Sequence, residues 1–139
     1  MKVRSTLLLV ALLAAGVMGL ITPAWPADSA AGKRFFKKCA ACHNLSADKH
    51  KIGPGLLGLF GRRAATAIGY KRYSKSMKTA GARGLIWNEG AFLQYIASPN
   101  QFLRDFLGDP KARTNMTFAG IKKDRDRENL LAYLLEATN

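Results

Sequence analysis

Both cysteines of this 139-residue chain lie in one pentapeptide, Cys39-Ala40-Ala41-Cys42-His43. The C-x-x-C-H pattern is typical of covalent c-type haem attachment. In that chemistry two thiols add across the two vinyl groups of the haem, and the adjacent histidine binds the iron. The pattern therefore predicts one covalent haem c, attached through Cys39 and Cys42, with His43 as the proximal iron ligand.

Two thiols this close together have three other common uses. A thioredoxin-like redox site needs a β-α-β context, and the sequence shows none. A zinc site could combine both cysteines with His43 and His50, but zinc ligands usually come in separated pairs, and His43 directly adjoins Cys42. A plain disulfide would add little stability and would leave the long loops unexplained. Haem attachment is therefore the favoured interpretation.

An iron that is bound by one histidine has a second axial position, for which the sequence offers three candidates. His50 is only seven residues beyond His43, which is too near to cross easily to the opposite face of a haem. Met77 lies in a predicted helical turn, where core packing would also explain it. Met116 lies in a flexible segment far along the chain. Spacing alone favours Met116 and leaves the other two open.

The elements that must position these residues are predicted to be short helices and long loops. Apolar periodicity predicts helices over 30–38, 88–98, 100–107 and 124–138, with one or two helical turns near 74–79. Asn88, Ser98 and Asp124 are the predicted N-caps. No alternating strand pattern exceeds three or four residues, so the fold class is all-α. Because short helices bury little, we expect something other than side chains to fill the centre.

The first 27 residues have the pattern of a secretory signal peptide. Lys2 and Arg4 precede the uncharged run Leu7–Ile21, and small residues follow it. A membrane span needs about 20 apolar residues, so this run is short for one. Retention of Ser5–Trp25 as an anchor on the periplasmic face of the inner membrane is the alternative. We expect an exported, periplasmic protein whose single domain covers residues 28–139.

The composition is strongly basic, with 22 Lys and Arg against 9 Asp and Glu and a formal charge of +13. Removing residues 1–27 takes away two cations and no acid, which leaves +11 on the domain. Two cysteines exclude a disulfide-dense scaffold, and the length excludes several large domains. A basic surface indicates an acidic partner, which could be nucleic acid, an anionic membrane or a protein. Composition alone does not choose among them.

Several separate stretches, in order, resemble the class I c-type cytochromes, close to mitochondrial cytochrome c and the long bacterial c2-type proteins. They are Gly32–His43, His50–Arg62, Tyr73, Ile86-Trp87, Tyr95, Thr117–Lys123 and the last helix, Arg127–Thr138. The resemblance implies the cytochrome c fold, in which short helices and long loops wrap around one haem. It also implies that the first and last helices cross, with Gly32 and Phe36 against Leu130 and Tyr133.

The same resemblance implies roles for individual residues around the haem. It makes Met116 the distal iron ligand and gives the carbonyl of Pro54 to the ring N–H of His43. The residues that match positions beside the haem propionates or the methionine are Arg62, Tyr73, Trp87, Tyr95 and Thr114. Residues 100–111 include more residues than the mitochondrial pattern has, which makes the path of the chain to Met116 harder to predict.

Histidine and methionine together leave no open position on the iron, which implies a one-electron carrier and not an enzyme. The expected donor is like a quinol:cytochrome c oxidoreductase, and the expected acceptor is like a terminal oxidase or a photosynthetic reaction centre. We expect a monomer that meets acidic surfaces of such complexes transiently and binds no nucleic acid. The side chains that we expect to steer the protein electrostatically onto these acidic surfaces are Lys37, Lys38, Lys49, Lys51, Lys111, Arg113, Lys122 and Lys123. The alternative is a haem peroxidase or small-ligand sensor with a labile distal methionine.

Overall fold

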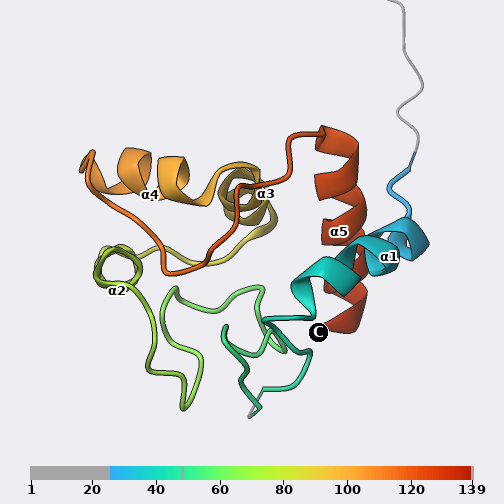
Figure 1. Ribbon diagram of the computed structural model, residues 1–139, viewed down its shortest axis with the longest axis horizontal. Coiled ribbons are helices and arrows are strands. Elements are labelled where there is room, and N and C mark those ends of the chain that lie inside the picture. Colours follow the sequence, from blue (N-terminus) through green and yellow to red (C-terminus); the bar gives the residue numbers. More distant parts are fainter. Residues whose placement is uncertain (1–25, 48, 139) are drawn as a thin grey trace, which may run out of the picture.

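The computed structural model describes residues 26–47 and 49–138, which form five helices joined by long loops (Figure 1). The helices are α1 (Ser29–Cys39), α2 (Lys75–Ala82), α3 (Glu89–Ala97), α4 (Pro99–Leu107) and α5 (Asp124–Ala137). The β-structure in these residues consists of one isolated antiparallel bridge between Arg63 and Ile86. The all-α prediction is confirmed. The predicted signal peptide lies outside the described residues, apart from Pro26 and Ala27.

Side-chain caps begin three of the helices. Asn88, the predicted cap of α3, accepts a hydrogen bond from the backbone N–H of Ala91 at 2.8 Å. Ser74 caps α2 in the same way, through a 3.0 Å bond from the N–H of Met77. Such bonds satisfy backbone donors that have no partner within the helix. Local sequence therefore explains where these helices begin.

Of the other two predicted N-caps, Ser98 occupies the cap position and Asp124 does not. Ser98 is the N-cap of α4, with Pro99 at the first helical position as predicted, although its side chain makes no cap hydrogen bond. Asp124 is the first residue of α5, and extended Lys123 occupies the cap position. The Asp124 carboxylate instead accepts a 2.6 Å bond from Arg127. A negative charge in the first turn is still favourable there, because it faces the positive end of the helix dipole.

The first and last helices cross, as predicted (Figure 1). Gly32 of α1 lies directly against the backbone of α5, and a Cβ added to it would be 1.9 Å from the Asn129 carbonyl oxygen. The rings of Phe36 and Tyr133 pack next to this contact, with centroids 5.5 Å apart. A residue without a side chain therefore allows the two helices to approach this closely.

The long loop between α1 and α2 is held by side chains rather than by regular structure. Tyr70 donates to the carbonyl of Ile52 at 2.6 Å, and Arg72 donates to the carbonyl of Lys51. The ring of His50 joins the same two stretches through the carbonyl of Ile68. Over the described ranges, no helix combines the length and the apolar character that crossing a membrane requires.

Candidate functional site

A cavity of about 360 Å³ lies between the helices and the loops. Its lining comes from α1, α2, α3, α5 and the loops between them. The structure brings to this one cavity all ten residues to which the motif and the family resemblance gave a place at the haem: Cys39, Cys42, His43, Pro54, Arg62, Tyr73, Trp87, Tyr95, Thr114 and Met116. The space that helices and loops do not fill is therefore where the chemistry-bearing side chains meet.

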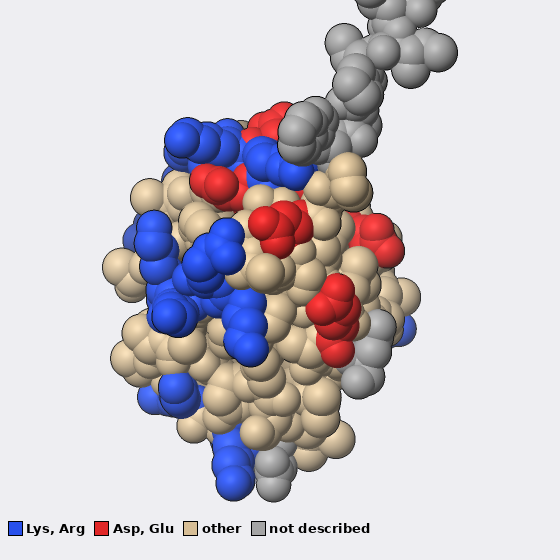
Figure 2. All heavy atoms as spheres, turned by 90° about the vertical axis from the view of Figure 1, so that its right-hand side faces the viewer, with Lys and Arg blue, Asp and Glu red and all other residues tan. Residues whose placement is uncertain are grey.

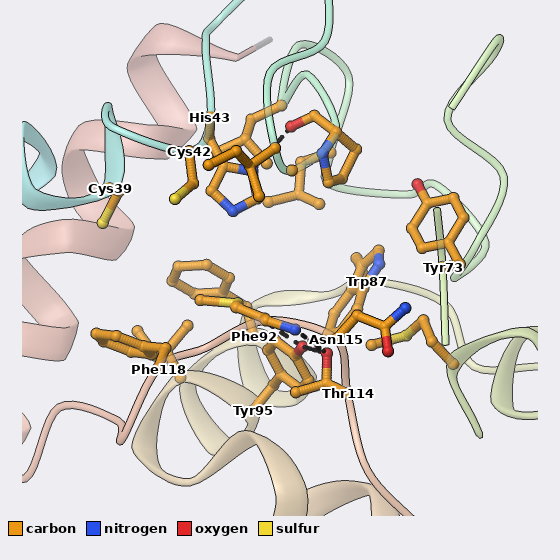
Figure 3. Close-up of a pocket in the computed structure, with 18 of the residues that line it drawn as sticks. Cys39, Cys42, His43, Tyr73, Trp87, Phe92, Tyr95, Thr114, Asn115 and Phe118 are labelled. Carbon is orange, nitrogen blue, oxygen red and sulfur yellow. Dashed lines mark hydrogen bonds between the residues drawn. The ribbon is translucent and has the colours of Figure 1, made fainter. Parts of the chain in front are cut away.

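One side of the cavity, here called the cysteine–histidine wall, consists of Cys39, Cys42 and His43 (Figure 3). Cys39 ends α1, and the backbone N–H groups of Cys42 and His43 both donate to its carbonyl, at 3.0 and 2.9 Å. This turn keeps the three side chains together. Neither cysteine forms a disulfide, and burial raises the pKa of the Cys39 thiol. Both thiols are thus available for attachment to a vinyl group.

The ring of His43 is oriented by the loop that follows it. Nδ1 lies 2.8 Å from the carbonyl oxygen of Pro54, so Nδ1–H donates and Nε2 keeps its lone pair. Burial lowers the pKa of His43, and the bond to Pro54 opposes this only in part. A Cβ on Gly53 would lie 2.3 Å from the ring, so the backbone itself supports the imidazole. The ring is therefore neutral and held, as an iron ligand must be.

The opposite side, here called the methionine wall, consists of Tyr95, Thr114 and Met116. The hydroxyl of Tyr95 donates to Thr114 Oγ1 at 2.9 Å and lies 3.8 Å from the sulfur of Met116. Thr114 Oγ1 also accepts the backbone N–H of Met116 at 3.1 Å. Burial raises the pKa of Tyr95 to about 12, which keeps its hydroxyl protonated and able to donate. These bonds tie Met116 to Tyr95 and Thr114, which lie across the cavity from His43 (Figure 3).

Tyr73 and Trp87 lie at one end of the cavity, away from the two cysteines (Figure 3). Arg62 also lines the cavity and donates to the carbonyls of Gly55 and Leu57, both at 3.2 Å. Trp87 is buried and packs edge-on against Tyr95. Burial lowers the pKa of Arg62, but not enough to remove its charge. Polar and cationic groups thus stand beside a mainly apolar cavity.

The lining fits a haem. It offers two thiols for the vinyl groups, a neutral imidazole and a thioether on facing walls, and apolar side chains between them. Among the described residues, its charged members are all cations, namely Lys38, Arg62 and Arg72, which suits the carboxylates of a haem. These residues would hold haem c, with both cysteines as the covalent links.

The structure does not support the competing interpretations of the cysteines. No group of three or more His, Cys, Asp or Glu side chains suited to a metal ion occurs in residues 26–47 and 49–138. His50 lies outside the cavity lining, and its two ring nitrogens bond to Ile68 and Gly55. The helical topology also lacks the β-α-β unit of a thioredoxin-like site in the part that is described.

Other lining residues were not predicted from the sequence as parts of the site. They include Lys38, Arg72, Phe92, Asn115, Phe118 and Leu130. Asn115 lies between two predicted site residues, and this position is the sequence feature that could have predicted it as part of the lining. Its side-chain amide donates to the carbonyl of Arg72 at 3.0 Å, 43 positions away in sequence. Met77 also lines the cavity, from α2, so the fold leaves two methionines facing it.

Short helices closed around a cavity that bears a C-x-x-C-H wall define a c-type haem protein. The family model described as Cytochrome c matches residues 29–138. The chain is 42% identical over 115 residues to cytochrome c2 of Cereibacter sphaeroides, covering 77% of this chain and 92% of the relative. It is also 42% identical over 108 residues to cytochrome c2 of Rhodospirillum rubrum, covering 77% and 95%.

Solved structures agree with the sequence relatives. The structure of cytochrome c2 from Rhodobacter sphaeroides has a TM-score of 0.75 and 40% identity, covering 81% of this chain and 97% of that one. Cytochrome c2 from Rhodospirillum centenum has a TM-score of 0.74 and 38% identity, covering 81% and 100%. The chain belongs to the cytochrome c family, as a class I c-type cytochrome of the c2 type.

This membership establishes the cofactor and the coarse function. The protein carries one covalently bound haem c, and the two cysteines fit its attachment. It is an electron carrier and not an enzyme. The alternative of a haem peroxidase or small-ligand sensor is not favoured.

Proposed function

We propose that this chain carries single electrons between membrane redox complexes, with His43 and Met116 as the two axial ligands of the haem iron. The haem, when bound, supplies a centre that gains and loses one electron. The observation that carries the proposal is the pair of facing walls, on which His43 is held by Pro54 and Met116 is held through Tyr95 and Thr114.

The protein's part in this function is to keep both ligands still and water out. Each ligand has its own hydrogen-bonded support, so neither needs to move when the charge of the site changes. Buried Phe92, Leu130 and Leu134 contribute apolar surface to the cavity. Histidine with methionine in apolar surroundings favours the reduced state. Arg62, Tyr73 and Trp87 serve the opposite need, since polar groups at their end of the cavity stabilise the haem carboxylates.

The charge of the surface indicates what kind of partner the carrier meets. Residues 49–88 contain nine Lys and Arg and no Asp or Glu. On the face formed by α1 and α5, basic side chains gather on one side while acidic ones are scattered over the other (Figure 2). We propose transient encounters of the monomer with acidic surfaces of two complexes. The donor is like a quinol:cytochrome c oxidoreductase, and the acceptor is like a terminal oxidase or photosynthetic reaction centre.

The rate of electron transfer to such a complex should fall at least roughly tenfold between about 10 and about 300 mM salt, because salt screens the attraction between the two proteins. Stopped-flow kinetics with a bacterial reaction centre measures this rate. A small uncharged reductant serves as the control and should react at nearly the same rate throughout. A protein–protein rate that does not change with salt would contradict the proposed steering.

We also propose that residues 1–27 direct export to the periplasm and are then removed. The cationic start and the short apolar run support this proposal. Mass spectrometry of the protein recovered from the periplasm should show a chain that begins near residue 25 or 28. Recovery of the full-length chain in the membrane fraction after a salt wash would instead support the anchor.

A further inference from the structure

The segment that carries Met116 obtains most of its backbone hydrogen bonds from side chains. Residues 111–116 contain no helix or strand. Four of their N–H groups donate to side-chain oxygens at 2.9–3.1 Å: Lys111 to Asp109, Arg113 to Ser76, Thr114 to Asn100, and Met116 to Thr114. Because no regular ladder fixes this backbone, individual side chains determine where it lies.

Two of these acceptors come from helices outside the segment. Ser76 Oγ of α2 accepts the N–H of Arg113 at 3.1 Å, across 37 positions of sequence. Asn100 Oδ1, in the first turn of α4, accepts the N–H of Thr114 at 2.9 Å. After leaving α4, the chain runs back past α2 (Figure 1). The two helices pack on each other, and Arg83 donates to the carbonyl of Leu107 to join them.

We propose that Ser76 and Asn100 are positioning residues for Met116. They hold the backbone two and three residues before the methionine against a rigid pair of helices, and they thereby oppose withdrawal of the sulfur from the iron. This inference rests on the proposed ligation by Met116. It adds residues that neither line the methionine wall nor touch the sulfur.

The two bonds should affect local opening more than global unfolding. Asn100 is exposed and Ser76 is half-buried, so water can replace either side chain in a variant. Global stability then changes little, since the core is untouched. Each variant removes one bond that keeps the segment closed. A neutral hydrogen bond contributes roughly a factor of five to an equilibrium constant, so the constant for local opening should rise by about that factor. Exogenous imidazole, which binds ferric iron only when the methionine has left it, reports this opening.

The experiment uses ferric holoprotein with the variants Asn100→Ala, Ser76→Ala and the two combined. The matched controls are Gln101→Ala, beside Asn100 on α4, and Thr79→Ala on α2, whose side chains bond only within their own helices. Imidazole is titrated while the red absorption band of sulfur-ligated ferric iron is followed. Guanidinium unfolding is measured on each protein. Hydrogen exchange of the Arg113 and Thr114 amides is followed by NMR.

Each single variant should bind imidazole roughly fivefold more tightly than wild type, and the combined variant roughly 25-fold, if the two bonds act independently. Exchange should accelerate at Thr114 in Asn100→Ala and at Arg113 in Ser76→Ala. Both controls should stay within about a factor of two of wild type. Asn100→Asp, which keeps an oxygen acceptor, should restore the wild-type imidazole affinity.

Two results would overturn the inference in different ways. Imidazole affinities in the single variants equal to those of their controls would refute the positioning role while leaving Met116 as the ligand. A wild-type protein without the sulfur-to-iron band would refute the ligation itself, and the inference with it.

Discussion

Substitution of Met116 by leucine should abolish the red absorption band of the ferric protein and lower its reduction potential by on the order of a hundred millivolts or more. Leucine has a similar volume but offers no sulfur, so the wall keeps its shape while the iron loses the distal ligand that we propose. The hydroxyl of Tyr95 then has only Thr114 as a nearby partner. Optical spectroscopy and a redox titration of the holoprotein measure both effects.

Met77→Leu is the matched control, because Met77 is the other methionine that lines the cavity. It is buried, and the polar contact that it makes comes from its backbone N–H, which donates to the Ser74 hydroxyl. Its replacement should leave the absorption band intact. Loss of the band in Met77→Leu, with retention in Met116→Leu, would show that the wrong methionine has been assigned.

Substitution of Gly32 by alanine should destabilise the fold by about 3 kcal/mol or more, measured by guanidinium unfolding of the holoprotein. A Cβ at this position would lie 1.9 Å from the Asn129 carbonyl oxygen and 2.8 Å from the Cβ of Tyr133. Because the obstacle is backbone, α1 and α5 must move apart. The same movement would weaken the ring contact between Phe36 and Tyr133.

Gly90→Ala provides the control for helix propensity. Gly90 is also helical, but it is exposed, and its added Cβ would meet nothing closer than 3.5 Å. Alanine should therefore stabilise α3 by up to about 1 kcal/mol. Changes of opposite sign in the free energy of unfolding for the two substitutions would separate the effect of packing from that of helix propensity. A stabilising Gly32→Ala would show that the two helices do not meet as closely as described.

Local patterns predicted much of the fold because their causes lie within a few residues. Asn88 caps α3 through the N–H three positions later, and such a bond depends on no distant contact. Asp124 shows the limit of this reasoning. It has the residue type of a cap, yet Lys123 is the extended residue at the cap position. The helix therefore begins at Asp124 itself, one residue earlier than a cap at Asp124 would place it. Sequence alone also left the second iron ligand open among His50, Met77 and Met116.

By itself, then, the sequence determined the attachment motif, the all-α class and the approximate place of each helix. The C-x-x-C-H spacing is short enough for one helical turn to place Cys39, Cys42 and His43 on one wall. Only the tertiary structure decided what lies opposite that wall. Thr114 meets Asn100 and Tyr95, and Arg113 meets Ser76, through contacts between residues far apart in the chain. Those contacts depend on how α2, α3 and α4 pack, and no short-range pattern specifies that packing.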